Sequence, residues 1–352
     1  MHKRHLLFWM LALIVFVFLL WLLSEILLPF VAGLALAYLQ VPLADKMERR
    51  GLNRTVASLL IVGVVVLVFI LLALLLAPIM AEQAAALMVS IPGYVTRLQE
   101  LLADPGPDWL RHLLNEGDAS KTMNELVAQG ATYLTALLSS LWSGGKALIS
   151  FISVLVIMPV VTFYLICDWH PMVAALDDWV PREQRATVHE LVKEIDAAIS
   201  GFLRGQTGVC LIVGCYYAVA LTLLGLNFGL LIGISAGILT FMPYVGSMSG
   251  LLIATSVAIG QFWPEWAHIA IVVAVFMFGQ FVEGNVLAPK LVGDKVGLHP
   301  VWLIFAMFAF GYLMGFVGLL IAVPLAAAIA VLFRFGLRRY MASPVYQGDA
   351  SG

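Results

Sequence analysis

The chain has 352 residues, of which 62% are hydrophobic and 11% are charged, and its formal net charge is −2. Soluble globular chains are roughly half apolar and about a quarter charged, so this composition and the mean hydropathy of +1.01 indicate an integral membrane protein. The sequence has no basic run of the kind that binds phosphates, and we expect no nucleic-acid partner.

Apolar runs that could cross a lipid bilayer recur along the chain. A transmembrane helix needs about 20 apolar residues to span about 30 Å of hydrocarbon, and four runs approach that length: Leu6–Leu23, Val56–Pro78, Ala147–Cys167 and Ala267–Val282. The first run is like a signal peptide but is too long and lacks a small-residue cleavage site, so we interpret it as a retained helix. The predicted fold is all-α: a polytopic helical membrane protein with interrupted or re-entrant helices and an extramembrane helical insertion.

The apolar runs and the polar stretches between them divide the chain into six predicted regions. Residues 1–80 hold N-terminal transmembrane helices, including a short hairpin that turns near Glu25–Pro29, and residues 146–167 form another transmembrane helix. Amphipathic helices are expected in an extracytoplasmic region, 81–145, and in a cytoplasmic region, 168–206, because apolar residues there recur at three- and four-residue spacing. Residues 207–340 form a C-terminal transmembrane core with broken helices, and residues 341–352 form a disordered tail.

The basic residues predict the orientation of the chain. Most of them lie in five clusters: Lys3–Arg4, Lys46–Arg54, Arg182–Arg204, Lys290–Lys295 and Arg334–Arg339. Lys and Arg favour the cytoplasmic side of a membrane, and the apolar runs allow an even number of crossings between successive clusters. We therefore expect a multi-pass membrane protein with both termini in the cytoplasm.

Enzyme motifs are incomplete in this sequence. Gly233–Gly237 spells G-x-S-x-G, but the serine-hydrolase elbow needs a preceding strand, and here Gly229, Gly233 and Gly237 recur every fourth residue of an apolar helical run. Such spacing of small residues predicts the close approach of two helices. The stretch HELVK (His189–Lys193) lacks the second histidine of the H-E-x-x-H zinc motif, and the sequence has no P-loop. We expect no enzyme, no cofactor and no metal site.

Helix breaks and polar residues in apolar surroundings favour a transport function. Pro29, Pro243 and Pro324 each interrupt a long apolar run. Broken helices are typical of secondary transporters, which build a site at the broken ends, although prolines are also common at ordinary kinks. Gln280 and Glu283 lie one helical turn apart at the end of an apolar run. A buried carboxylate in a membrane often marks an ion or proton path.

These polar residues also have plainer interpretations. Glu283 could reach the headgroups at the cytoplasmic surface instead of facing a path. Arg204 and Gln206 lie at the mouth of a helix that begins near Thr207, where either a surface anchor or a pore lining is consistent with the sequence. The sequence alone leaves these alternatives open.

Four stretches place proline, glycine and polar residues within apolar sequence. They are PFVAGLALAYLQVPLADKMERRGLNRTVA (Pro29–Ala57), GFLRGQ (Gly201–Gln206), FMPYVGSMSG (Phe241–Gly250) and EGNVLAPKLVGDKVGLHPVWLIFAMFAFGYLMGFVGLLIAVPLAA (Glu283–Ala327). Together they resemble the autoinducer-2 exporter family, also called PerM-like permeases, and the similarity covers nearly the whole chain. The last stretch is the most specific of the four.

The resemblance implies a polytopic inner-membrane permease that forms homo-oligomers, with a pentamer as the expected form. Members of such a family are linked to export of the furanone autoinducer-2, and others to sodium/proton exchange. Together with the residues argued above, the matched positions give these candidates for a substrate or ion path: Gln280, Glu283, Asn285, Lys290, Arg204 and Gln206. The candidates for helix breaks or gating are Pro29, Pro243, Gly246, Pro289, Gly293, Pro300 and Pro324.

Three functions stay open at this stage. The leading hypothesis is an ATP-independent permease or exporter of small polar solutes, such as autoinducer-2-like signalling molecules, with the lipid bilayer as its surroundings. The second is an antiporter coupled to sodium or protons, which would need an obligatory carboxylate. The third is an oligomeric membrane scaffold that transports nothing.

Overall fold

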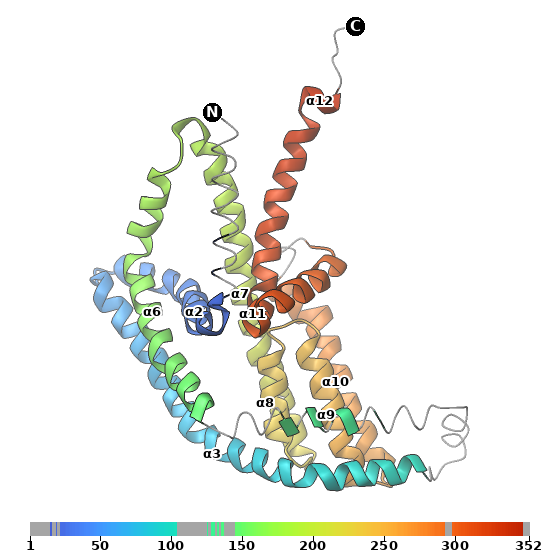
Figure 1. The fold of residues 1–352 in the computed structure, drawn as a ribbon. Coiled ribbons are helices and arrows are strands. Elements are labelled where there is room, and N and C mark those ends of the chain that lie inside the picture. The colour runs from blue at the N-terminus through green and yellow to red at the C-terminus, as the bar shows by residue number, and fades with distance from the viewer. Residues whose placement is uncertain are drawn as a thin grey trace. The chain divides into compact units, whose positions relative to one another are not determined.

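The computed structural model describes residues 22–103, 145–292 and 298–347, with a few single positions outside these ranges. Every regular element in those ranges is a helix (Figure 1). Seven of the described helices are long and apolar enough to cross a membrane. The predicted all-α, polytopic fold is therefore confirmed. Contacts group the chain into two compact units: unit one is Met1–Val66, Ser153–Gln206 and Pro289–Gly352, and unit two is Leu67–Ile152 and Thr207–Ala288.

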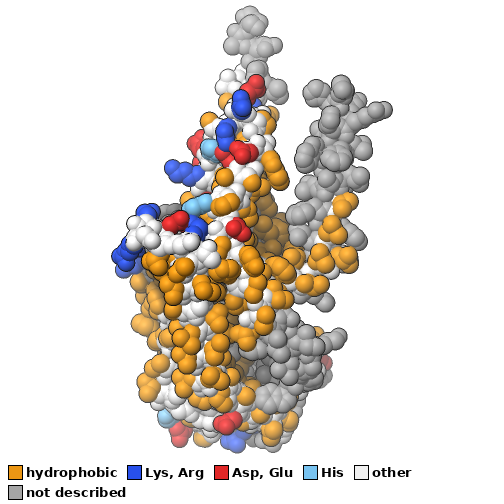
Figure 2. Space-filling model, turned by 90° about the vertical axis from the view of Figure 1, so that its left-hand side faces the viewer, with side chains coloured by type: hydrophobic (Ala, Val, Ile, Leu, Met, Phe, Trp, Pro, Cys, Tyr) orange, Lys and Arg blue, Asp and Glu red, His pale blue; other side chains and the backbone are white. Residues whose placement is uncertain are grey.

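Large apolar side chains lie on the surface of the helices, as a lipid environment requires. On α3 (Arg54–Ala103), Leu59, Val64, Leu74 and Leu75 are all more than half exposed. Figure 2 shows hydrophobic side chains over much of the coloured surface of the visible face. A soluble protein rarely exposes so large a contiguous apolar surface, and lipid tails are the solvent that such a surface suits.

Unit one is built around the packing of α2 (Ser24–Glu48) on the neighbouring parts of α3 and α6 (Gly145–Asp178). Its core is a cluster of small and branched side chains: Ala37, Val41, Ala44, Ile61, Val62 and Ile166. Helices α2 and α6 approach closely at Gly33, whose carbonyl accepts a hydrogen bond of 3.1 Å from the Thr162 hydroxyl. A Cβ at Gly33 would lie 2.9 Å from Val161 Cγ1, so an alanine here would force the two helices or the Val161 side chain to shift.

Two of the expected helix breaks are not seen in the structure. Helix α2 continues through Pro29, and α11 (Pro300–Met341) continues through Pro324. A proline removes one backbone hydrogen bond, and neighbouring helices in a membrane protein can compensate for that loss. The break in α11 lies instead at Gly315, with φ 58° and ψ −137°, a conformation that only glycine adopts without strain. The bend it produces is visible in Figure 1.

Several helices run across the boundaries expected from the sequence. Helix α3 has 50 residues and passes Ala81 without interruption. Helix α6 continues past Cys167 to Asp178, and α7 spans Arg185–Leu223 after the short 3-10 helix η1 (Arg182–Gln184). At 1.5 Å per residue, α3 is about 75 Å long, more than twice the thickness of the hydrocarbon layer. A continuous helix can therefore carry both an apolar and a polar region.

Unit two packs the short helix α8 (Gly229–Leu239) between α7 and α9 (Val245–Phe262). Added Cβ atoms at Gly229, Gly233 and Gly237 would each collide with the backbone of α7, at Leu221, Ala218 and Gly214 respectively. The predicted close approach of two helices through glycines spaced four apart is confirmed. Ser235 lies within α8, so the G-x-S-x-G stretch forms no strand-to-helix elbow.

Helix α8 is capped by a side chain from another helix. Its N-cap residue, Phe228, is left-handed with φ 62° and supplies no capping side chain. The Leu231 N–H, one of the N-terminal amides that lack a partner within a helix, instead donates to Gln83 Oε1 of α3 over 2.9 Å. The preceding turn is tied to α9, because Gln261 accepts from the Asn227 N–H and donates to the Gly225 carbonyl.

Replacing Gln83 by leucine is expected to speed hydrogen exchange of the Leu231 amide by about fivefold, because a hydrogen bond contributes about 1 kcal/mol net. Amide exchange followed by mass spectrometry measures this rate. The control is Glu82→Leu, at the exposed neighbouring position of α3. Equal exchange of the Leu231 amide in both variants would show that Gln83 does not cap α8.

Candidate functional site

A polar cluster lies in unit two, formed by the buried Ser247 and Tyr217 and the half-buried Gln280 and Glu283. Ser247 belongs to α9, Gln280 to α10 (Trp266–Val282), Tyr217 to α7, and Glu283 begins the π-helix η2 (Glu283–Val292). The Gln280 amide donates a hydrogen bond of 2.8 Å to the Ser247 hydroxyl, which is 3% exposed. The Tyr217 hydroxyl lies against Gly279 of α10, where an added Cβ would come within 2.5 Å of it.

The turn at Pro243 sets the position of Ser247. Helix α8 ends at Leu239 and α9 begins at Val245, so Pro243 lies in the short connection between them. Gly246 follows at the start of α9, and a Cβ there would overlap Thr240 and Ala236. Ser247 therefore sits in the first turn of α9, beside backbone amides that carry the positive end of the helix dipole.

Two polar atoms of the cluster are buried without a partner. Among the described residues, neither Glu283 Oε2 nor the Tyr217 hydroxyl makes a hydrogen bond. Tyr217 is fully buried and stacks on Phe276, with ring centroids 4.4 Å apart. The neighbouring Tyr216, by contrast, donates to the Val275 carbonyl over 3.1 Å. A buried polar group without a partner costs about 1–3 kcal/mol, so these two atoms mark a place where a small polar molecule, water or a cation would be stabilised.

The backbone changes its winding where Glu283 emerges from α10. Residues Glu283–Val292 form a π-helix, a rare element that is frequent at functional sites. Pro289 lies inside it and has no N–H to donate to the carbonyl five residues earlier. The Asn285 amide donates back to the Phe281 carbonyl over 2.9 Å, which directs this side chain toward its own helix.

Two of the sequence motifs meet within unit one. A Cβ at Gly205 of α7 would overlap the backbone carbonyl of Leu291 in η2. The GFLRGQ stretch therefore packs backbone to backbone against the end of EGNVLAPKLV. Gln206 is 6% exposed, and Lys290 and Arg204 are exposed.

The remaining candidates have separate places in the fold. Pro300 is the first residue of α11, where a missing N–H costs nothing, and the preceding His299 ring caps the Val301 N–H at 3.3 Å. Gly293 lies outside the described residues.

Sequence reasoning missed Ser247 and Tyr217. Ser247 stands within the FMPYVGSMSG motif and could have been found there, whereas Tyr217 lies in an apolar run and gives no sequence signal.

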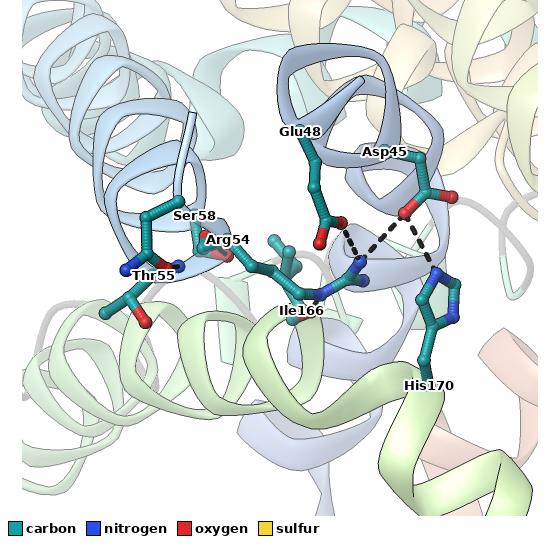
Figure 3. A network of polar contacts seen from close by, with 8 residues as sticks. Asp45, Glu48, Arg54, Thr55, Ser58, Ile166 and His170 are labelled. Atoms are coloured by element: carbon teal, nitrogen blue, oxygen red, sulfur yellow. Dashed lines mark hydrogen bonds and ion pairs between the residues drawn. The ribbon is translucent and has the colours of Figure 1, made fainter. Parts of the chain in front are cut away.

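A second polar network joins three helices of unit one (Figure 3). Arg54, whose side chain is 13% exposed, donates to Asp45 at 3.0 Å and to Glu48 at 2.8 Å, both near the end of α2. Its Nε donates to the Ile166 carbonyl of α6 at 2.8 Å. The His170 ring, also on α6, lies 3.3 Å from Asp45. This network ties helix ends together, and we assign it a structural role.

An all-α, multi-pass membrane protein with a broken helix pair and polar atoms buried among its helices has the construction of a membrane transport protein. Residues 10–338 match the family model described as AI-2E family transporter. The chain belongs to this family.

Three relatives are similar over most of their lengths. The chain is 27% identical to YrrI of Bacillus subtilis over 326 residues, covering 90% of this chain and 88% of the relative. It is 28% identical to PerM of Escherichia coli (strain K12) over 313 residues, covering 87% and 86%. It is 25% identical to the AI-2 transport protein TqsA of the same strain over 317 residues, covering 88% and 85%. The family supports a role in membrane transport.

Proposed function

We propose that the chain is an inner-membrane permease that exports small polar solutes by a secondary mechanism that uses no ATP. The observation that carries the proposal is a pair of buried polar atoms, Glu283 Oε2 and the Tyr217 hydroxyl, that have no hydrogen-bond partner among the described residues. They accompany the hydrogen-bonded pair Gln280 and Ser247. The name of TqsA suggests autoinducer-2-like molecules as substrates. Both termini face the cytoplasm, and the protein works as a homo-oligomer in the bilayer.

Each member of the cluster has a distinct part in this mechanism. Glu283 supplies a charge that a solute hydroxyl can satisfy by donating a hydrogen bond. Gln280 and Ser247 bind one side of the solute. They give up the hydrogen bond between them and form hydrogen bonds to the solute instead, so this exchange changes the free energy little. The turn at Pro243 and the π-helix at Pro289 are the backbone breaks that allow α9 and the end of α10 to move.

Glu283→Gln is expected to reduce solute flux in proteoliposomes at least tenfold, because the amide keeps the shape of the side chain and removes its charge. Flux is measured with labelled autoinducer-2 and a panel of small polyols. The matched control is Glu265→Gln. Glu265 precedes α10, at the opposite end of the helix from Glu283, and its side chain is 65% exposed. Unchanged flux is expected for this variant. Wild-type flux in a folded Glu283→Gln protein would remove Glu283 from the mechanism.

A sodium- or proton-coupled antiporter is the second candidate, favoured by the same unpaired carboxylate oxygen. In this case Glu283 binds the coupling ion, and a pH gradient across vesicles should dissipate when sodium is added. A pH-sensitive dye follows the gradient. A gradient that does not respond to sodium with the wild-type protein would eliminate this candidate and leave the uncoupled permease.

A further inference from the structure

A cavity of about 470 Å³ opens between α7 and α11 of unit one. Helix α7 contributes Thr187, Glu190 and Glu194 to its lining, and α11 contributes Phe335, Arg338 and Arg339. Leu191 adds a second apolar side chain. The cavity thus combines two acids, two arginines, a hydroxyl and two apolar groups.

The cavity lies at the far end of the α11 arm that follows the break at Gly315. After the break at Gly315, the helix runs from Phe316 to Phe335 before it reaches the arginines. That is about 20 residues, or about 30 Å, which equals the hydrocarbon thickness. Exposed apolar side chains on this arm continue up to the cavity: Ile329, Leu332, Phe333 and Leu337. With this arm across a bilayer, the arginines would lie at headgroup depth, next to a surface suited to acyl chains.

The charges in the cavity are only weakly satisfied by one another. Arg338 and Glu194 approach to 3.7 Å, a long ion pair whose side chains are 59% and 39% exposed. Within the described residues, Glu190 and Arg339 form no ion pair. The formal charge of the lining is zero, because two acids offset two arginines. The glutamates would repel a free anion, and the arginines would repel a free cation. A ligand that carries both charges therefore suits the cavity best.

We propose that this cavity binds a zwitterionic phosphoethanolamine group, supplied by a phospholipid of the surrounding bilayer. The two guanidinium groups donate to the phosphate oxygens, a pairing for which arginine is well shaped. The primary ammonium donates to Glu190 and Glu194, and the Thr187 hydroxyl offers a further donor to the phosphate. The acyl chains follow the exposed apolar side chains of α11. The same headgroup chemistry occurs in soluble glycerophosphoethanolamine, which the experiment separates from the lipid.

The test is native mass spectrometry of the full chain after exchange into detergent with equal amounts of phosphatidylethanolamine, phosphatidylglycerol and phosphatidylcholine of matched chains. Phosphatidylethanolamine is expected to remain bound at least fivefold more than the other two. The double variant Arg338→Gln/Arg339→Gln should lose this preference. Glu190→Gln/Glu194→Gln should shift it toward the anionic phosphatidylglycerol. Arg334→Gln, on the same arm and outside the cavity lining, is the control that should keep the preference.

Equal retention of all three lipids by the wild-type protein would overturn the proposal, as would a preference that survives both double variants. Retention of glycerophosphoethanolamine by a protein that shows no preference among the three lipids would contradict the lipid source and indicate a soluble zwitterion. Size-exclusion elution at the wild-type volume establishes that each variant is folded. None of these outcomes depends on whether Glu283 takes part in transport.

Discussion

Gly237→Ala is expected to lower the thermal unfolding midpoint of the purified protein by several degrees, although alanine normally stabilises a helix. The new Cβ would overlap the Gly214 Cα of α7, so α7 and α8 would have to separate along the glycine contact. Overpacking of this kind costs about 1–3 kcal/mol, which outweighs the gain of about 0.5–1 kcal/mol from helix propensity. Midpoints are measured in detergent by size-exclusion chromatography after heating.

Gly63→Ala is the matched control, because a Cβ at Gly63 of α3 meets no atom of the described residues within 4 Å. Its midpoint should stay the same or rise, so the two substitutions of identical chemistry are expected to change stability in opposite directions. If Gly237→Ala were as stable as Gly63→Ala, the contact between α7 and α8 would not be as close as the structure shows.

The glycine contact also bears on the polar cluster. Helix α8 lies between α7, which carries Tyr217, and α9, which carries Ser247. On its α9 side, Ala236 contacts the positions of Gly246 and Gly250. A displacement of α8 away from α7 would therefore move Ser247 relative to Gln280, and Gly237→Ala should reduce flux even where the protein remains folded.

Arg54→Leu is expected to destabilise unit one by about 2–3 kcal/mol. Removing one partner of a fully buried ion pair costs about 3–5 kcal/mol, and exposed pairs contribute about 0–1 kcal/mol. Arg54 is 13% exposed, but Asp45 and Glu48 are 27% and 46% exposed, so the cost should lie between these limits. The loss arises because two carboxylates lose their shared cation and the Ile166 carbonyl loses a donor.

The control is Arg49→Leu, an exposed arginine in the turn after α2, for which little change in unfolding midpoint is expected. Arg54→Lys should recover only part of the stability, because a single ammonium cannot reproduce the planar set of donors that reaches both α2 and α6. An Arg54→Leu protein with the midpoint of Arg49→Leu would mean that the network contributes no stability.

The sequence by itself determined the class of the fold. Long apolar runs without alternation can satisfy their backbone groups in lipid only as helices, and this fixed the all-α, multi-pass architecture. Glycines spaced four apart along Gly229–Gly237 also predicted close helix packing, since helical periodicity puts them on one face. Gln280 and Glu283 were placed on one helical face by the same periodicity.

Only the tertiary structure decided which helices meet and where they break. Ser247 and Gln280 are 33 residues apart, and nothing local to either residue encodes their hydrogen bond. Tyr217 belongs to an apolar run and becomes notable only because packing buries its hydroxyl with no hydrogen-bond partner in the described part of the chain. At Pro29 and Pro324 the helix continues, because neighbouring helices can compensate for the backbone hydrogen bond that a proline removes. The bend at Gly315 has a different cause, since it needs a backbone conformation that glycine adopts without strain.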